Sequence, residues 1–344
     1  MYNLNSMFKK IKFFKDNFPE YFTDMVNSEH AENQFLSNPY HIEGNVWTHT
    51  MCVCSHLQSA PNLLQWAGLL HDIGKPDCRK INDFRVSFFS HGGYGIFKAL
   101  EVLKLANIPE KEIKIIIRLI AKHQDLYLKG TKNTLLIDDV NEVIFYEYLK
   151  ELTKADSLGA MSEEFREEVS TKNIFQDFTD TNNYKNEIIV MIGVPNSGKS
   201  YSLSNYDLSN YTVISRDDLL FEVANLKSNK NLSYNESWKY CTENDLQKEI
   251  DKTLLKNFNS AYRNKENIIV DMTNLSKKSR NKFVAQVKDY KKIAHLVLSD
   301  YKTILNRNLS RGGKFIQEDI IKTMMKRFTF PDYSQFSEIK FEIN

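Results

Sequence analysis

Residues 193–200 constrain the fold of this chain more than any other feature. They spell Gly-Val-Pro-Asn-Ser-Gly-Lys-Ser and directly follow the β-branched run Ile188–Ile192. A Gly-x4-Gly-Lys-Ser pattern between a buried strand and a helix is typical of a phosphate-binding loop, in which backbone N–H groups surround phosphate oxygens. The pattern therefore predicts a bound nucleoside triphosphate. An ordinary glycine-rich turn is the alternative interpretation.

The loop assigns roles to its own side chains. Lys199 is expected to neutralise the β- and γ-phosphates of ATP or another nucleoside triphosphate, and Ser200 to coordinate Mg²⁺. The helix that follows also favours negative charge at its N-terminus. From this stretch we expect the nucleotide to be bound by Gly193, Asn196, Ser197, Gly198, Lys199 and Ser200.

The pattern of strands and helices divides the chain into two halves. After the loop, short apolar runs at Tyr211–Ile214, Ile268–Val270 and Ala294–Leu298 alternate with helical stretches, which predicts a parallel sheet covered by helices. Before residue 171 the chain is helical by periodicity, apart from a short ribbon near Phe84–Phe89. The clearest helices are expected at Leu63–Leu70, Gly95–Ala106 and Glu110–Ala121.

The length of 344 residues suits two domains of ordinary size. The polar segment 171–186 is the natural boundary. We predict a helical domain at 1–175, of which 1–35 is an N-terminal extension, a linker at 176–186 and an α/β domain at 187–344. No run of about 18 apolar residues is present, so no membrane span is expected. Four irregularly spaced cysteines favour reduced thiols and a cytoplasmic location.

Charge is distributed unevenly between the halves. Residues 186–344 hold 25 Lys and Arg against 19 Asp and Glu, a balance of +6, whereas residues 1–185 hold 21 against 25, a balance of −4. A basic half suits a polyanionic substrate. One basic stretch either follows a nucleic-acid backbone or is a solvated helix face, and it contains Lys277, Lys278, Arg280, Lys282, Lys288, Lys291 and Lys292.

Two further elements of the second half carry charged side chains. Asp217 follows the second expected strand, where it would face the ligand crevice and accept the proton of an attacking hydroxyl. A helix N-cap is the alternative role. Arg307 and Arg311 lie four residues apart on one helix face, as a phosphate clamp requires or as a solvated face allows.

Seven of the eight histidines precede residue 124. Neutral imidazoles together with carboxylates suit Mn, Fe, Co, Ni or Zn, and two adjacent ions can bind a phosphate and generate hydroxide. Because His71 and Asp72 are adjacent, a chance occurrence of this set of metal-ligand residue types is improbable. The candidate ligands come from separate helices and are His49, His71, Asp72, His91, His123 and Asp156.

From about Ile188 to Tyr333 the motifs GVPNSGKS, SRDDL, DMTN, RNLSRG and MMKRFTFPD follow one another in the order of the phage-type polynucleotide 5′-hydroxyl kinase, which this half resembles. The resemblance implies that Asp217 is the general base and that Arg311, supported by Arg307, contacts the donor phosphates. It places Thr273 and Asn274 at the substrate. One departure concerns the acceptor: the family carries an Arg three residues after the catalytic Asp, and here Leu220 occupies that position.

The first half resembles the HD phosphohydrolase superfamily from about Tyr40 to Gly159, through PYHIEGNVWTHT and LHDIGK. The resemblance implies core metal ligands at His49, His71, Asp72 and Asp156, with His91 and His123 matching two-metal members. It implies phosphate contacts from Lys75 and His41, and makes Asp72 and Lys75 catalytic. His30, His56 and His295 match nothing and are expected to be structural or surface residues.

Together the halves resemble the HD-domain polynucleotide kinases, which heal RNA ends. The expected fold is an all-α HD-type metal phosphohydrolase followed by an α/β P-loop kinase. The layout implies phosphorylation of 5′-hydroxyl ends and removal of 2′,3′-cyclic or terminal 2′- or 3′-phosphates, with RNA or DNA ends and a separate RNA ligase as partners. The alternatives are a nucleoside or small-metabolite kinase fused to an HD nucleotidase, and a kinase with a nucleotide-sensing HD module.

Overall fold

The computed structural model describes residues 4–32, 37–38, 41, 43–82, 85–126, 140–160, 184–312 and 314–344. The chain divides into two compact units, Met1–Thr179 with Met325–Phe330, and Asp180–Met324 with Pro331–Asn344. Of the expected linker, residues 176–183 lie outside the described residues, as do residues 33–35 of the expected N-terminal extension.

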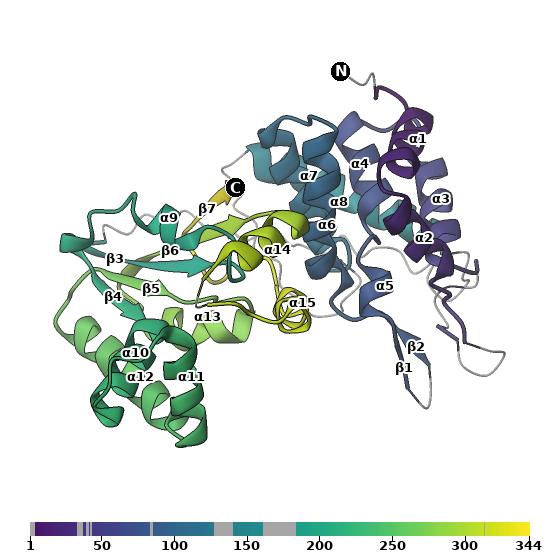
Figure 1. Cartoon of the computed structure of the whole chain (residues 1–344). Coiled ribbons are helices and arrows are strands. Elements are labelled where there is room, and N and C mark those ends of the chain that lie inside the picture. The colour runs from purple at the N-terminus through teal and green to yellow at the C-terminus, as the bar shows by residue number, and fades with distance from the viewer. Residues whose placement is uncertain are drawn as a thin grey trace. The chain divides into compact units, whose positions relative to one another are not determined.

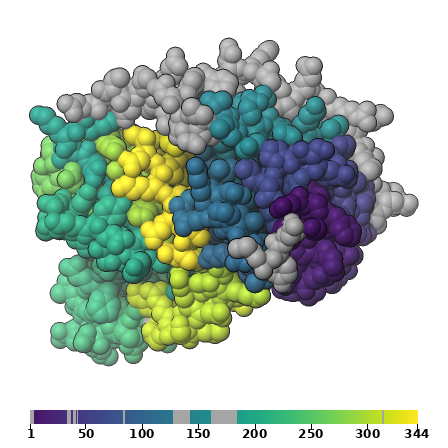
Figure 2. All heavy atoms as spheres, turned by 90° about the horizontal axis from the view of Figure 1, so that it is seen from above, coloured from purple at the N-terminus to yellow at the C-terminus, as the bar shows by residue number. Residues whose placement is uncertain are grey.

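The first unit is helical with one small ribbon, as the sequence predicts (Figure 1). In the sphere view, the purple helices α1 and α2 lie on the surface of this unit against its blue-violet segments (Figure 2). The elements are α1 (Met7–Asn17), α2 (Pro19–Asn27), α3 (Val46–His56), α4 (Asn62–Leu70), α5 (Lys75–Cys78), β1 (Lys80–Ile81), β2 (Val86–Ser87), α6 (His91–Leu105), α7 (Glu110–Lys122) and α8 (Val140–Gly159).

The helices of the first unit form because their apolar residues recur on one face and their ends are capped. In α7, Ile113, Ile116, Ile117 and Ile120 are buried at three- and four-residue spacing. In α3, the Asn45 side chain accepts a hydrogen bond from the Thr48 backbone N–H at 2.8 Å. These features fix two of the helices on which the histidines lie.

A glycine brings α6 close to the turn that carries His71 and Asp72. A Cβ atom at Gly74 would lie 2.3 Å from the His91 carbonyl oxygen and 2.7 Å from the Gly95 nitrogen. Only glycine permits this approach of backbone to backbone. The start of α6, with His91, is therefore held beside Asp72.

The second unit is an α/β layer structure with α9 above the sheet and α12 and α13 below it in the view of Figure 1. Its elements are β3 (Asn186–Ile192), α9 (Lys199–Leu203), a 3-10 turn (Leu208–Asn210), β4 (Thr212–Ser215), α10 (Arg216–Ser228), α11 (Tyr234–Glu243), α12 (Gln247–Arg263), β5 (Ile268–Asp271), α13 (Lys277–Val284), β6 (Tyr290–Leu298), α14 (Tyr301–Ser310), α15 (Glu318–Lys326) and β7 (Glu338–Ile343).

The five strands form one sheet in the order β4-β5-β3-β6-β7, and every neighbouring pair is parallel. Ile189 of β3 pairs in register with Ile269 and Ile293. These three side chains join Met191 and Val297 in a buried cluster, against which Leu203, Tyr206, Tyr211 and Val213 pack. The parallel sheet predicted from the apolar runs is confirmed.

Some boundaries differ from those expected. β6 begins at Tyr290 rather than Ala294, and α6 begins at His91 rather than Gly95, because glycines weaken the helical pattern there. β7 was not expected from the sequence, because apolar and charged residues alternate in Glu338–Ile343 and no apolar run marks the strand. No described helix is long and apolar enough to cross a membrane.

The basic stretch that follows β5 is not a uniform solvated face. Arg280 is fully buried, and its guanidinium donates to Gln335 Oε1 at 3.0 Å, to the Leu275 carbonyl at 3.1 Å and to the Asn274 carbonyl at 3.3 Å. Burial lowers the pKa of Arg280 to about 10. Arg280 therefore ties α13 to the segment after β5 and does not reach a nucleic-acid backbone.

We predict that Arg280→Met lowers the free energy of unfolding of the second unit by about 3 kcal/mol, because it leaves buried acceptors without donors. Urea denaturation measures the change. Lys282→Met, at an exposed position of the same helix, is the control and should change stability by no more than about 0.5 kcal/mol. Equal stability of the two variants would contradict the structural role of Arg280.

Candidate functional site

The first unit gathers a cluster of histidines and carboxylates in its core. α3 carries His49, the turn after α4 carries His71 and Asp72, α6 begins with His91, and His123 caps α7. Asp156 comes from α8. All six candidate ligands are at least nine-tenths buried, so helices far apart in sequence converge on one point.

Asp72 lies between two pairs of imidazoles. Its Oδ2 atom is 3.2 Å from His71 Nε2 and 3.5 Å from His49 Nε2. Its Oδ1 atom is 3.0 Å from His91 Nε2 and 3.8 Å from His123 Nε2. The carboxylate therefore belongs to two groups of ligand atoms, His49–His71–Asp72 and Asp72–His91–His123.

The hydrogen bonds of the four rings fit metal binding. The Nδ1 atoms of His71, His91 and His123 lie 2.7–2.8 Å from backbone carbonyl oxygens of Gly68, Phe88 and Ile120, and must donate to them. Each of these rings therefore turns its Nε2 atom toward the cluster. His91 and His123 Nε2 are 3.0 Å apart, and His49 and His71 Nε2 are 3.3 Å apart. Lone pairs facing at these distances repel unless a cation lies between them.

Two further carboxylates, those of Asp156 and Glu43, contact the His49–His71–Asp72 group. Asp156 Oδ1 lies 2.8 Å from His49 Nε2 and 3.4 Å from His71 Nε2. His49 Nδ1 lies 2.7 Å from Glu43 Oε1, so a carboxylate orients this ring from behind. Imidazole and carboxylate ligands suit divalent transition-metal ions. The backbone carbonyls and the Glu43 carboxylate, which contact the outer ring nitrogens, orient these ligands.

Lys75 lies beside this cluster with three acceptors around its ammonium group. Its Nζ atom is 2.7 Å from Asp72 Oδ2, 3.3 Å from His41 Nε2 and 3.4 Å from His30 Nε2. An ammonium group carries three donors, so this arrangement accounts for all of them. Lys75 is nearly fully buried and is held in one position.

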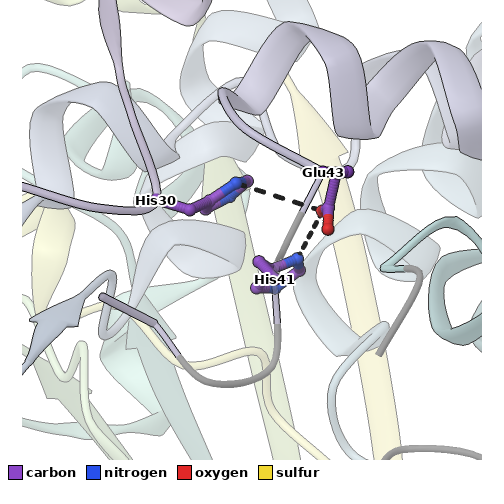
Figure 3. A group of neighbouring side chains, drawn as sticks. All are labelled: His30, His41 and Glu43. Atoms are coloured by element: carbon purple, nitrogen blue, oxygen red, sulfur yellow. Dashed lines mark hydrogen bonds and ion pairs between the residues drawn. The ribbon is translucent and has the colours of Figure 1, made fainter. Parts of the chain in front are cut away.

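His30, His41 and Glu43 form a third group that also resembles a metal site (Figure 3). His41 Nδ1 is 2.7 Å and His30 Nδ1 is 4.0 Å from Glu43 Oε1, while His30 Nδ1 is 2.9 Å from the Gly44 carbonyl. Burial and the Lys75 charge lower the pKa of His41 to about 4, so the ring is neutral near pH 7. Because both Nε2 atoms face Lys75, this trio supports the lysine rather than a metal ion.

A cavity of about 510 Å³ opens beside the cluster. It reaches the metal-ligand candidates His91 and Asp156 and the expected phosphate contacts His41 and Lys75. The remaining wall is formed by Asn38, Arg85, Val86, Ser87, Phe88, Phe89, Gln124, Ser157 and Ala160. The cavity therefore gives a substrate access to both the ligand cluster and the buried ammonium group.

In the second unit, the phosphate loop joins β3 to α9. Asn196 and Gly198 adopt positive φ angles of 67° and 106°, which turn the backbone around the loop. Lys199 Nζ donates to the carbonyl oxygens of Gly193 and Val194 at 2.9 and 3.0 Å. Burial lowers the pKa of Lys199 to about 8, although Asp271 and Asp217 oppose the shift.

Arg307 of α14 and Arg311 at the end of this helix contact the phosphate loop. Arg307 donates to the Asn196 carbonyl at 3.2 Å and to Ser299 Oγ at 3.0 Å. Arg311 donates to Asn196 Oδ1 at 3.0 Å. Both guanidinium groups therefore lie at the phosphate loop, as a clamp requires.

Asp217 shares one cavity of about 990 Å³ with the loop and the arginines. Asp217 is in the first turn of α10, directly after β4. The wall contains Pro195, Asn196, Gly198, Lys199, Ser200, Tyr201, Ser215, Arg216, Asp217, Asp218, Tyr234, Trp238, Asp271, Met272, Thr273, Arg307, Ser310, Arg311, Lys314, Ile316, Met324 and Asn344. A nucleotide and a hydroxyl acceptor can therefore meet in one space.

Three expected nucleotide or substrate residues do not line this cavity. Gly193 N–H donates to the Thr273 carbonyl at 3.0 Å, and Ser197 is fully buried in the loop. Asn274 is also buried, and its amide donates to the Met191 carbonyl at 2.9 Å, which joins β3 to the segment after β5. Thr273 faces the cavity, so only one member of the Thr-Asn pair is exposed to a ligand.

Several residues at these sites had no assigned role in the sequence analysis. Glu43 and His30 lie in loops before α3, where no periodicity marks them, and His30 is buried beside Lys75. The His295 ring is also buried and lies between the Tyr206 hydroxyl and Glu342. Both histidines were expected to be structural or surface residues. Asp271 ends β5, and that position at the carboxyl end of a parallel strand was the available signal.

Comparisons with known proteins agree with this division. Residues 44–172 match the family model described as HD domain, and residues 188–331 match the one described as AAA domain. The first unit thus contains an HD domain, and the second an AAA-type P-loop domain with a five-stranded parallel sheet. No curated protein matches the sequence significantly.

Two solved structures show weak similarity. The Pnkp1/Rnl/Hen1 RNA repair complex aligns with 20% identity and a TM-score of 0.32 over 44% of this chain and 46% of that chain. A gluconokinase from Sinorhizobium meliloti 1021 aligns with 16% identity and a TM-score of 0.28 over 45% of this chain and 81% of that one. The alignment with the first spans less than half of its length. Similarity at this level identifies neither substrate nor partner.

We predict that Glu43→Gln lowers the affinity of the first unit for Mn²⁺ by roughly 10- to 100-fold, because an amide cannot replace the carboxylate that orients His49. Isothermal titration calorimetry with Mn²⁺ measures the effect. Glu101→Gln is the control, since Glu101 accepts a hydrogen bond from the Tyr21 hydroxyl on another face of α6. Wild-type affinity in Glu43→Gln would show that Glu43 does not orient a metal ligand.

The lowered pKa of Lys199 predicts a pH dependence of ATP binding. Phosphate contacts require the ammonium form, so affinity should be constant below pH 8 and fall by up to about tenfold per pH unit above it, until the pKa of the bound state is reached. Equilibrium binding between pH 7 and 10 tests this. AMP lacks the β- and γ-phosphates and is the control; a parallel decline for AMP and ATP would exclude Lys199 as the cause.

Proposed function

We propose that this protein is an end-healing enzyme for broken nucleic acids, with two separate active sites. The P-loop unit transfers the γ-phosphoryl group of ATP to a 5′-hydroxyl end. The HD unit removes a 2′,3′-cyclic phosphate or a terminal 2′- or 3′-phosphate. The observation that carries the kinase assignment is the single cavity shared by the phosphate loop, Arg307, Arg311 and Asp217.

Asp217 is the general base of the kinase in this proposal. Its carboxylate accepts the proton of the attacking 5′-hydroxyl while the oxygen forms a bond to the γ-phosphorus and ADP leaves. The position supports this role, because Asp217 lies in the cavity wall at the end of β4 and its side chain is more than half exposed. A carboxylate serving only as a helix cap is not needed here, since Ser215 caps α10.

The donor side of the cavity is strongly cationic. Lys199 and the clamp formed by Arg307 and Arg311 bind the β- and γ-phosphates and offset the charge that develops during transfer. Mg²⁺ held by Ser200 would supply further neutralisation of the phosphates. ATP is the proposed donor, and the loop backbone itself does not discriminate between nucleoside triphosphates.

In the HD unit, His49, His71, Asp72 and Asp156 would hold one divalent metal ion, and Asp72, His91 and His123 a second. Such ions supply Lewis acidity toward phosphate oxygens and water. Mn²⁺, Ni²⁺, Co²⁺, Fe²⁺ and Zn²⁺ all suit these ligands. Lys75, fixed by its three acceptors, contacts the phosphate from the cavity side, and His41 orients Lys75 rather than acting alone.

The two activities convert the ends left by RNA cleavage into a 5′-phosphate and a 3′-hydroxyl. These are the ends that a ligase joins, so we propose a separate RNA ligase as partner. Resemblance to HD-domain polynucleotide kinases supports this reading, as does the basic balance of the second half. The competing function is that of a nucleoside or small-metabolite kinase. The two functions differ in the acceptor that receives the phosphoryl group.

The decisive assay incubates the protein with γ-labelled ATP and matched 5′-hydroxyl RNA, 5′-hydroxyl DNA or free nucleosides. We expect label on the oligonucleotides. Label on nucleosides alone would contradict the end-healing proposal. A parallel assay follows phosphate release from RNA with a 2′,3′-cyclic end in the presence of each metal ion, and no release in folded protein would identify the HD unit as a sensor.

We predict that Asp217→Ala lowers kinase activity by roughly 10²- to 10⁴-fold and leaves the phosphoesterase unchanged, since it removes only the general base. Asp72→Ala should abolish phosphoesterase activity and leave the kinase intact. Each variant controls for the folding of the other. Loss of both activities from either change, in protein with a wild-type circular dichroism spectrum, would show that the two sites are not independent.

A further inference from the structure

The acceptor side of the kinase cavity lacks the arginine that the family resemblance leads one to expect. Leu220 at that position is fully buried, and its carbonyl oxygen lies 3.7 Å from Cys241 Sγ of α11. It packs α10 against α11 and does not line the cavity. Some other group must therefore bind the acceptor strand near Asp217.

The neighbouring Arg216 is already engaged. Its Nε atom donates to Asp251 Oδ1 at 2.8 Å, and Nη2 donates to Gln247 Oε1 at 2.6 Å. These contacts direct the guanidinium toward α12. Arg216 lines the cavity, but two of its donors are committed to side chains of α12.

Two aromatic residues occupy the cavity wall on the acceptor side. Tyr234 and Trp238 lie four residues apart on α11 and hence on the same helix face. Trp238 is 51% exposed although it belongs to a cavity wall. An indole left open in this way presents a large apolar face to whatever enters beside Asp217.

Tyr234 and Lys314 connect this wall to the general base. The Tyr234 hydroxyl donates a hydrogen bond to the Asp217 carboxylate, and burial with the nearby Asp217 charge raises the pKa of Tyr234 above its ordinary value. Lys314 Nζ lies 3.8 Å above the Tyr234 ring centre and 3.8 Å from Asp217 Oδ2. The Lys314 side chain is about one-third exposed, so it can still reach an anion.

We propose that Trp238 is the stacking platform for the 5′-terminal base of a single-stranded acceptor, and that Lys314 contacts the first internucleotide phosphate. The proposal rests on the kinase function proposed above and names its acceptor class. Tyr234 is a positioning residue that holds the Asp217 carboxylate. A polyol or other small alcohol has no π-face to stack and no phosphate at that distance, so this wall matches a nucleic-acid strand.

Stacking on an aromatic side chain tolerates every base, because each base offers a π-face. That property suits an enzyme that repairs breaks irrespective of sequence. Trp238 and Lys314 together also replace part of the binding that an arginine would provide. Lys314 supplies the charge, and Trp238 supplies the contact area. We therefore expect weak preference among the four bases at the 5′ end.

The first test measures steady-state kinetics on a 5′-hydroxyl oligonucleotide. Trp238→Ala should raise the acceptor KM by roughly 5- to 100-fold and leave the KM for ATP within twofold of wild type. Trp238→Phe, which keeps a π-face, should recover most of the loss. Phe221→Ala is the matched control, because Phe221 is 39% exposed on α10 and does not line the cavity.

The second test pairs the variant with an altered acceptor. An oligonucleotide whose 5′-terminal residue is abasic should raise the wild-type KM about as much as Trp238→Ala does, and combining the two should add little more. If the KM increases caused by the abasic acceptor and by Trp238→Ala multiply fully when combined, the stacking contact is overturned. Lys314→Gln should reduce the slope of log KM against log salt by about 0.7, and an unchanged slope would overturn the phosphate contact.

These outcomes separate two failures. If wild-type protein labels no oligonucleotide, the proposed kinase function itself fails. If it labels oligonucleotides and Trp238→Ala keeps the wild-type acceptor KM, only the assignment of Trp238 fails.

Discussion

The carboxylate of Asp72 is the group on which the first unit depends. It is 1% exposed in a helical core, where an unpaired charge would be prohibitively costly. Burial alone would raise its pKa, but the charges of His71 and Lys75 outweigh burial and hold the pKa well below its ordinary value. Helices α3, α4, α6 and α7 must therefore stay in the positions that deliver four imidazoles to a single carboxylate, and α5 in the position that delivers the Lys75 ammonium group. The same helix positions therefore form both the core of the first unit and the cluster of candidate metal ligands.

The second unit follows a different constraint, namely the common direction of its strands. β3 leads into the phosphate loop, β4 into Asp217, β5 into Asp271 and Thr273, and β6 into the arginine helix α14. Because all five strands are parallel, their carboxyl ends open at one edge, and ligands of such sheets bind there. The cavity is thus a consequence of sheet topology, and each strand contributes a different chemical group to it.

Under the proposed function, the two sites treat phosphate in opposite senses, since one would add it and the other would remove it. Their cations differ accordingly. The kinase cavity uses side-chain cations that are available without metal, whereas the HD cluster concentrates imidazole lone pairs that need a metal ion or protons between them. Among the described residues, Lys75 is the ammonium group joined directly to the HD cluster, through Asp72, and its two other partners, His30 and His41, are neutral imidazoles.

The sequence by itself located both candidate sites, because the loop at 193–200, the His71-Asp72 pair and Asp217 are local patterns whose spacing is set by a turn or a strand end. It also predicted the parallel sheet from apolar runs. Tertiary structure alone decided which groups meet. Glu43 and His30 join the cluster through loops without periodicity, Asn274 turns into the core rather than the cavity, and Trp238 reaches the acceptor side on a helix whose placement depends on packing against α10. Such contacts between distant segments follow from how the elements pack, which no local pattern records.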